Sequence, residues 1–245
     1  MSLSLPEEQS AKQNYVRSLF DGIASRYDLL NHLLSFGFDI LWRKKAIRLL
    51  RGYHPRLMLD VATGTCEFAI EAAASLDAEV TGVDISTQML NIGRGKVRRK
   101  GLEHRVRLDL GAAESLNFKA ETFDAVTVAF GVRNFSDFRL GLREMRRVLR
   151  PGGVALILEF SKPRQYFFSR LYSLYFHRVL PVIGGLVSGN QDSYEYLPQS
   201  VGNFPDSTAF LEILRSIGFS ATEEHRLTFG IATIYLAIKA ASESQ

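Results

Sequence analysis

The turn at residues 62–65 constrains the fold of this chain more than any other feature of the sequence. An apolar run at 57–62 leads directly into the small-residue turn Thr63-Gly64-Thr65, and a helical segment at 68–76 follows. Apolar runs then alternate with helical segments up to residue 160, the runs lying at 79–84, 106–110, 124–130 and 154–160. This alternation is typical of a parallel sheet with helices on both faces.

The C-terminal part of the chain departs from that alternation. A capped helical segment at 206–219 precedes two more expected strands, 221–227 and 231–240, which predict an antiparallel hairpin at the edge of the sheet. We therefore expect an α/β, Rossmann-like fold with a mostly parallel seven-stranded sheet and an antiparallel edge strand.

Two segments add to this core. Residues 8–51 carry apolar residues at helical spacing ahead of any expected strand, and so predict an N-terminal helical cap over residues 1–51. Residues 52–240 form the α/β domain, which a helical and aromatic insertion interrupts at about 164–203. The single cysteine, Cys66, cannot form an internal disulfide, and neither a signal peptide nor a transmembrane run is found. These features predict a cytoplasmic protein.

The first turn has the features of a nucleotide site. Asp84 ends the second apolar run 20 residues after Gly64, at the spacing where an acidic residue binds a ribose. Cys66 and Ala69 stand where the later glycines of the dinucleotide fingerprint would fall. A pyrophosphate needs the close backbone approach that those glycines allow, whereas S-adenosylmethionine (SAM) has no pyrophosphate. The third turn, Gly111-Ala112-Ala113, could bind adenine through its backbone. A tight turn that binds no ligand is the alternative.

Six strings extend this pattern over residues 14–240. They are FDGIASRYDLLNHLLSFG from Phe20, LDVATGT from Leu59, FGVRNF from Phe130, VLRPGG from Val148, LEFSKP from Leu158 and DSYEYLPQS from Asp192. Together they resemble the UbiE/MenG family, the C-methyltransferases of ubiquinone and menaquinone biosynthesis. The resemblance implies a class I methyltransferase that uses SAM to methylate a ring carbon of a prenylated quinol, with the menaquinone pathway favoured.

The resemblance also implies a set of cofactor-binding residues. Cys66 stands where the family often has glycine or alanine, Ala112 where it usually has Asp or Asn, and Ala129 where many members have Ser. These departures leave the backbone contacts and Asp84 in place. The expected SAM contacts are Gly64, Thr65, Asp84, Ala112, Ala113 and Ala129.

Ring methylation needs an electron-rich quinol, and a nearby cation lowers the pKa of its hydroxyl group. Arg133, after the fourth apolar run, is the candidate cation, and Asn134 could orient the ring oxygen. Tyr27 comes from the cap, which could close over the site. An ion pair is the alternative for Arg133, and an exposed helical histidine is the favoured reading of His32. No metal site is expected.

Other partners remain open at this point. The net charge is +4, and the basic segment 93–100 is compatible with RNA, with anionic lipid or with a solvated helix face. The string Phe130-Gly131-Val132-Arg133 lacks the prolines typical of base N-methyltransferases, so no nucleic acid is expected. A SAM-binding regulator without enzymatic activity is a further alternative. Aromatic residues at 164–190 predict contact with the inner face of the plasma membrane, or else core packing. An oligomer is compatible with the sequence.

Overall fold

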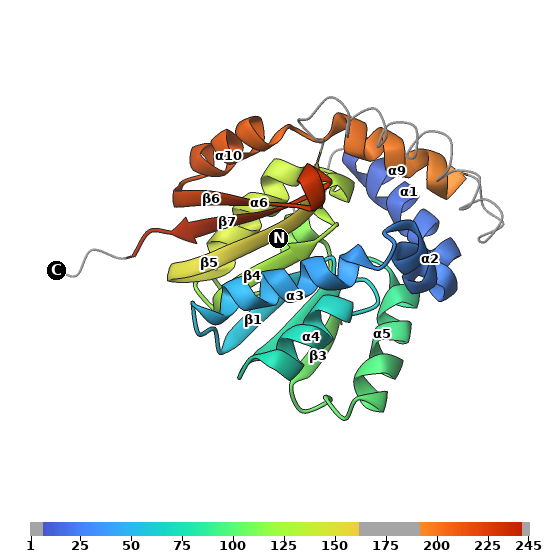
Figure 1. The fold of residues 1–245 in the computed structure, drawn as a ribbon, viewed down its shortest axis with the longest axis horizontal. Helices are drawn as coiled ribbons and strands as arrows, with labels where there is room; N and C mark the ends of the chain where they lie inside the picture. Colours follow the sequence, from blue (N-terminus) through green and yellow to red (C-terminus); the bar gives the residue numbers. More distant parts are fainter. Residues whose placement is uncertain (1–6, 162–191, 242–245) are drawn as a thin grey trace.

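The computed structural model describes residues 7–161 and 192–241, and these form one seven-stranded sheet with helices on both faces (Figure 1). The strand order is β3-β2-β1-β4-β5-β7-β6. The strands are β1 (Leu57–Val61), β2 (Glu79–Asp84), β3 (Val106–Leu110), β4 (Phe123–Ala129), β5 (Leu149–Phe160), β6 (Phe219–Leu227) and β7 (Ala232–Lys239).

The expected Rossmann-like fold is confirmed. Strands β1 to β5 pair in parallel, whereas β7 is antiparallel to both of its neighbours, β5 and β6. The antiparallel edge is thus the β6–β7 hairpin. Strand β5 begins at Leu149, earlier than the sequence suggested, because Leu149 pairs with Phe123 before the register shifts and resumes at Val154.

The helices form two layers and a cap. Apolar residues of α3, α4 and α5 pack on one face of the sheet, and those of α6 and α10 pack on the other. Side-chain caps start three of these helices: Ser86, Asp137 and Asp206 each accept a backbone N–H at 3.0 Å. The helices are α1 (Glu7–Ile23), α2 (Tyr27–Leu34), α3 (Phe38–Arg51), α4 (Glu67–Ser75), α5 (Thr87–Arg99), α6 (Phe138–Val148), α9 (Asp192–Asn203) and α10 (Ser207–Ser216).

Helices α1 and α2 lie beyond the carboxyl ends of the parallel strands, on the right in Figure 1. Strand β1 lies between β2 and β4, so the chain reverses its direction of winding at the carboxyl end of β1. Open α/β sheets bind their ligands at this switch point. The cap therefore stands directly over the expected ligand crevice.

The insertion expected at 164–203 is described only at its end, by α9. The aromatic stretch 164–190 lies outside the described residues. Within the described ranges, no helix is both long and apolar enough to cross a membrane.

Candidate active site

The turn after β1 brings backbone N–H groups to the end of β2. Ala62, Gly64 and Cys66 all adopt positive φ angles, of 53°, 55° and 69°. This left-handed geometry points the Gly64 N–H at the Asp84 carboxylate, which accepts it at 2.8 Å. Helix α5 packs closely behind, because a Cβ on Gly93 would collide with Cys66 Sγ. The turn is thus held between the sheet and α5.

Asp84 is placed as the sequence predicted, at the carboxyl end of β2 on the crevice wall. It is 9% exposed, and its second carboxylate oxygen accepts the Ser86 N–H at 2.8 Å. Burial raises the pKa of Asp84 to about 6, and the negative charge of Asp21 on α1 adds to the shift. A carboxylate in this position retains free lone pairs for ligand hydroxyl groups.

Asp60 is a second buried acid in the crevice, and the sequence reasoning did not select it. Thr63 and Thr127 donate hydrogen bonds to its two carboxylate oxygens at 2.6 and 2.7 Å. Burial raises its pKa to about 6, with a further contribution from the charge of Asp84. An aspartate within the apolar run 57–62 was the available signal, since an acid inside a buried strand is rarely without function.

A cleft lies between the cap and the strand ends. Small molecules usually bind in clefts at this place in open α/β sheets. The residues expected at the site that line this cleft are Tyr27, Gly64, Asp84, Ala113, Ala129 and Asn134. Thr65, Ala112 and Arg133 do not line it.

A second, smaller cavity adjoins the cleft beneath α2 and α3. Tyr27, Gly64 and Ala129 line both spaces, so these three residues form part of a shared wall. Asp60 and Thr65 line only the second cavity. The crevice is therefore divided around the β1 turn, with Asp84 on one side and Asp60 on the other.

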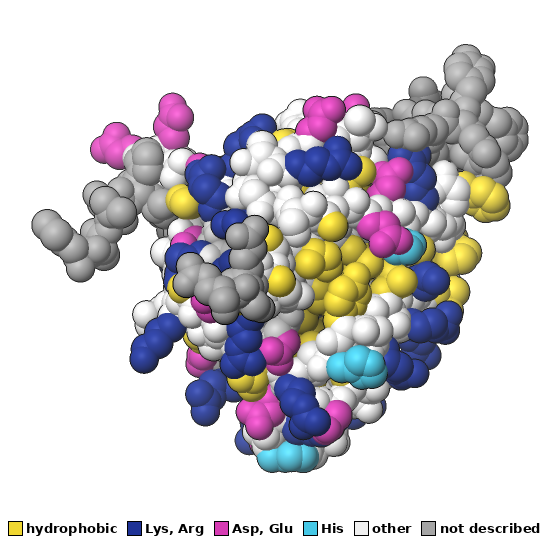
Figure 2. All heavy atoms as spheres, turned by 90° about the vertical axis from the view of Figure 1, so that its left-hand side faces the viewer, with side chains coloured by type: hydrophobic (Ala, Val, Ile, Leu, Met, Phe, Trp, Pro, Cys, Tyr) yellow, Lys and Arg dark blue, Asp and Glu magenta, His cyan; other side chains and the backbone are white. Residues whose placement is uncertain are grey.

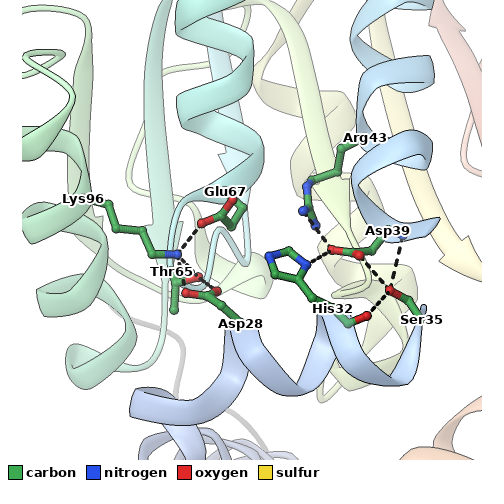
Figure 3. Close-up of polar contacts among 8 residues, drawn as sticks. All are labelled: Asp28, His32, Ser35, Asp39, Arg43, Thr65, Glu67 and Lys96. Atoms are coloured by element: carbon green, nitrogen blue, oxygen red, sulfur yellow. Dashed lines mark hydrogen bonds and ion pairs between the residues drawn. The ribbon is translucent and has the colours of Figure 1, made fainter. Parts of the chain in front are cut away.

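Thr65 connects the turn to the cap (Figure 3). Its hydroxyl donates to Asp28 Oδ1 on α2 at 2.5 Å and accepts from Lys96 on α5 at 3.1 Å. Lys96 also forms ion pairs with Asp28 and, at 2.5 Å, with Glu67. One lysine of the basic segment 93–100 thus joins three elements instead of facing solvent.

A second polar cluster fixes the connection between α2 and α3 (Figure 3). Asp39, which is 3% exposed, accepts from Ser35 Oγ at 2.6 Å and pairs with Arg43 at 2.8 Å and with His32 Nδ1 at 2.7 Å. Burial raises the pKa of Asp39, but these hydrogen bonds and charges outweigh it and lower that pKa. His32 is therefore an anchored side chain, although it remains 36% exposed.

Arg133 forms an ion pair, which was the alternative to a direct role in the chemistry. Its guanidinium donates to Glu159 Oε1 on β5 and to the Phe130 carbonyl, both at 2.6 Å. The two side chains are 7% and 0% exposed. Burial raises the pKa of Glu159, and the Arg133 charge opposes that rise. The Arg133 charge also acts on Tyr27, lowering its pKa against a larger rise from burial.

Two adjacent side chains of the turn 132–134 hold buried polar atoms that have no hydrogen-bond partner among the described residues. Asn134 Oδ1 and Arg133 Nε are both buried, and neither has a hydrogen-bond partner within the part of the chain that the structure describes. The first is an acceptor and the second is a donor. A buried polar atom without a hydrogen-bond partner lowers the stability of the folded protein, and a hydrogen bond to a ligand would offset that loss.

The fold and the acidic crevice define the chain as a class I methyltransferase with SAM as its cofactor. The residues fit this cofactor, because Asp84 stands where ribose hydroxyl groups would bind and the buried carboxylates favour a cationic ligand. The ubiE/COQ5 methyltransferase family matches residues 8–239, and the chain belongs to that family.

Individual relatives agree with this assignment. The chain is 48% identical to the ubiquinone/menaquinone biosynthesis C-methyltransferase UbiE of Geobacter sulfurreducens, over 93% of this chain and 90% of that protein. It is 47% identical to the demethylmenaquinone methyltransferase of Thermus thermophilus, over 89% and 98% of the two chains.

Solved structures support the fold alone. A SAM-dependent methyltransferase of Thermotoga maritima, described as a possible histamine N-methyltransferase, matches with a TM-score of 0.65 at 18% identity, over 91% of this chain and 99% of that one. The [4+2]-cyclase SpnF matches with a TM-score of 0.66 at 17% identity, over 99% of both chains.

Proposed function

We propose that this enzyme methylates a ring carbon of a prenylated quinol, and that demethylmenaquinol is its substrate. The relatives named for this activity support the reaction. The observation that carries it here is Asn134, which lines the cleft and whose buried Oδ1 has no hydrogen-bond partner within the described part of the chain. A quinol hydroxyl in the cleft can donate a hydrogen bond to this oxygen.

The chemistry requires an electron-rich ring carbon beside an electrophilic methyl group. SAM supplies that methyl group on a sulfonium, and the neutral thioether is the leaving group. The new C–C bond uses an electron pair of the quinol ring, and the ring carbon then loses its proton to solvent. The quinone form lacks the donating hydroxyl groups, so only the reduced substrate should react.

Arg133 is proposed to favour the ionised quinol. Its guanidinium pairs with Glu159 and does not line the cleft of the free protein. Its Nε–H, which has no partner among the described residues, is the donor proposed to stabilise the oxyanion once the quinol is bound. Glu159 holds the guanidinium in place and acts as a positioning residue. Tyr27 lines both cavities from the cap and is proposed to pack against the reacting groups.

The cap is proposed to close the crevice against water. The expected division into a cap over residues 1–51 and a methyltransferase domain over residues 52–240 is kept as part of this proposal, although α3 also packs on the sheet. Asp28 and Asp21 bond Thr65 and Ser86, one at each of the first two turns of the sheet domain. Cofactor contacts are proposed for Gly64, Thr65, Asp84, Ala112, Ala113 and Ala129.

Methyl transfer to a short-tailed demethylmenaquinol tests the proposal directly. Purified enzyme with isotope-labelled SAM should label the ring of the chemically reduced substrate and leave the oxidised quinone unlabelled. A strain lacking the gene should accumulate the unmethylated precursor, and the wild-type gene should restore the methylated quinone. Labelling of neither quinol nor quinone by a protein that binds SAM would overturn the proposal.

RNA is the alternative substrate, and it is tested by the same assay. Figure 2 shows the face of the molecule away from the cap, and this face carries Lys, Arg, Asp and Glu side chains of both signs around a hydrophobic centre. A phosphate backbone instead favours a continuous basic surface. Labelled RNA together with unlabelled quinol in the same assay would favour the RNA alternative.

A further inference from the structure

The outer surface of the α2–α3 hairpin is apolar, although it faces away from the sheet. We name the hairpin patch by its six exposed residues, among which Phe36 is 74%, Leu29 61% and Leu41 58% exposed. Leu29 and Leu33 are four residues apart and share one side of α2. The hairpin patch consists of Leu29, Leu33, Phe36, Phe38, Ile40 and Leu41.

The inner side of the same hairpin belongs to the crevice. Asn31, His32 and Arg43 line the second cavity, and Leu30 is buried at 2% exposed. A cap that only covered a site would be expected to carry polar residues outward. The hairpin instead carries apolar residues on its inner and its outer side. An apolar patch that remains exposed usually marks an interaction site, so we expect a partner on the outer side.

The tip of the hairpin is held rigidly in a strained conformation. Phe36 and Gly37 adopt positive φ angles of 52° and 75°, and the Gly37 N–H donates to the His32 carbonyl at 2.8 Å. The cluster of Ser35, Asp39 and Arg43 ties both helices to this turn. A phenylalanine in left-handed geometry is uncommon. The backbone of the tip therefore has a defined conformation.

The charge on α3 identifies the kind of partner. Lys44, Lys45 and Arg48 follow the apolar residues of the first turn, and Lys44 and Arg48 are exposed. Asp39 is the only acidic residue of α3, and it is buried and paired. An apolar tip followed by cations matches an anionic bilayer, in which apolar groups enter the interface and cations meet phosphates.

We propose that the α2–α3 hairpin docks the enzyme on an anionic membrane surface, with the hairpin patch in the headgroup region. The proposal rests on the proposed function, since a prenylated substrate resides in the bilayer. Docking by this hairpin places the crevice immediately behind the membrane contact. A second copy of the chain is less suited to this face, because α3 offers exposed cations without exposed carboxylates.

Vesicle cosedimentation of the full chain tests the docking. Wild type should bind vesicles of phosphatidylcholine and phosphatidylglycerol, and bind pure phosphatidylcholine more weakly. The double variant L33S/L41S should bind vesicles about tenfold or more weakly than wild type. Each leucine side chain is removed from water when the hairpin docks, and serine loses that contribution to binding. Leu110→Ser, at a leucine 64% exposed on β3, is the matched control and should bind like wild type.

Charge reversal separates the electrostatic part of the docking. K44E/R48E should weaken binding to anionic vesicles several-fold, whereas R99E/K100E at the end of α5 should have little effect. All variants should keep wild-type circular dichroism and SAM affinity. Equal losses for the α3 and α5 charge variants would overturn the proposed orientation.

Quinols with long and short tails allow the membrane docking to be tested separately from the proposed function. L33S/L41S should slow turnover of vesicle-borne long-tailed quinol and leave turnover of a short-tailed soluble quinol unchanged. A wild type that methylates the short-tailed quinol but binds no vesicles refutes the docking alone. A wild type that binds vesicles but methylates neither quinol refutes the function alone. A wild-type dimer that L33S/L41S dissociates, without vesicle binding, would assign the hairpin patch to a second copy.

Discussion

The pKa of Asp84 gives the sharpest test of the cofactor site. The carboxylate already accepts the Gly64 and Ser86 N–H groups, and it can accept ribose hydroxyl groups only while it is ionised. Its pKa is raised from 3.8 to about 6 in the free protein. SAM binding should therefore weaken as the pH falls through about 6. Linkage predicts roughly tenfold weaker binding at pH 5 than at pH 8.

The variant Asp84→Asn should weaken SAM binding and reduce its pH dependence. Losing the charge from hydrogen bonds worth about 1.5–3 kcal/mol should raise the SAM Kd at pH 8 by roughly 10- to 100-fold. The substituted carboxamide does not titrate, so the Kd of this variant should change less between pH 5 and pH 8 than the wild-type Kd does, and the remaining change should come from Asp60. Isothermal titration calorimetry across that range measures both effects.

Asp21→Asn supplies a matched control for this experiment. Asp21 on α1 raises the pKa of Asp84 and accepts a hydrogen bond from Ser86 Oγ at 2.5 Å. Removing its charge should lower the pKa of Asp84, so the midpoint of the pH dependence should move to lower pH while the slope persists. If folded Asp84→Asn bound SAM with wild-type affinity and the wild-type pH slope, the assignment of Asp84 would be wrong.

Three further perturbations test other parts of the site. Arg133→Lys should lower kcat by roughly 10- to 100-fold through loss of charged hydrogen bonds, while the SAM Kd stays within about threefold in calorimetry; equal losses in both would indicate a structural role. Glu159→Ala should lower the free energy of unfolding by about 3 kcal/mol in urea titration, because it leaves the buried Arg133 charge unpaired; a near-neutral effect would show that water reaches the pair. Lys96→Met should weaken SAM binding by about 1 kcal/mol and increase proteolysis within α2, because Asp28 and Glu67 lose their shared cation; unchanged proteolysis would show that the cap is held by other contacts.

Periodicity was sufficient to predict the sheet and the helices around it. The runs 79–84 and 106–110 coincide with β2 and β3, and the capped segment after Asp206 is α10. These elements are defined locally, by apolar spacing and by capping residues. The start of β5 was placed too late because its first pair, Leu149 with Phe123, depends on a neighbouring strand.

The polar clusters could not be predicted in the same way. Asp28 meets Thr65 across 37 residues, and Arg133 meets Glu159 across 26. Such contacts exist only after the sheet order and the cap position are set, and side-chain charge alone does not select one partner among many. Motif spacing located Asp84, whereas the burial of Asp60 became visible only in the structure.

The charges of the crevice indicate why these two acids are buried at all. The nearby cations are already paired: Arg43 with Asp39, Lys96 with Asp28 and Glu67, and Arg133 with Glu159. Within the described part of the chain, Asp60 and Asp84 have only neutral donors, and burial raises the pKa of each to about 6.

Both acids should therefore destabilise the free enzyme at neutral pH. A raised carboxyl pKa favours the folded state below about pH 4, and that stability is lost as the pH rises through about 6, by roughly 3 kcal/mol for each group. Asp60→Asn should accordingly raise the free energy of unfolding at pH 8 without cofactor, and weaken SAM binding. Two carboxylates without a cationic partner among the described residues should repel a pyrophosphate, whereas SAM, with a sulfonium, an ammonium and one carboxylate, has a net positive charge. We therefore expect the charge of the crevice to favour a cationic nucleoside.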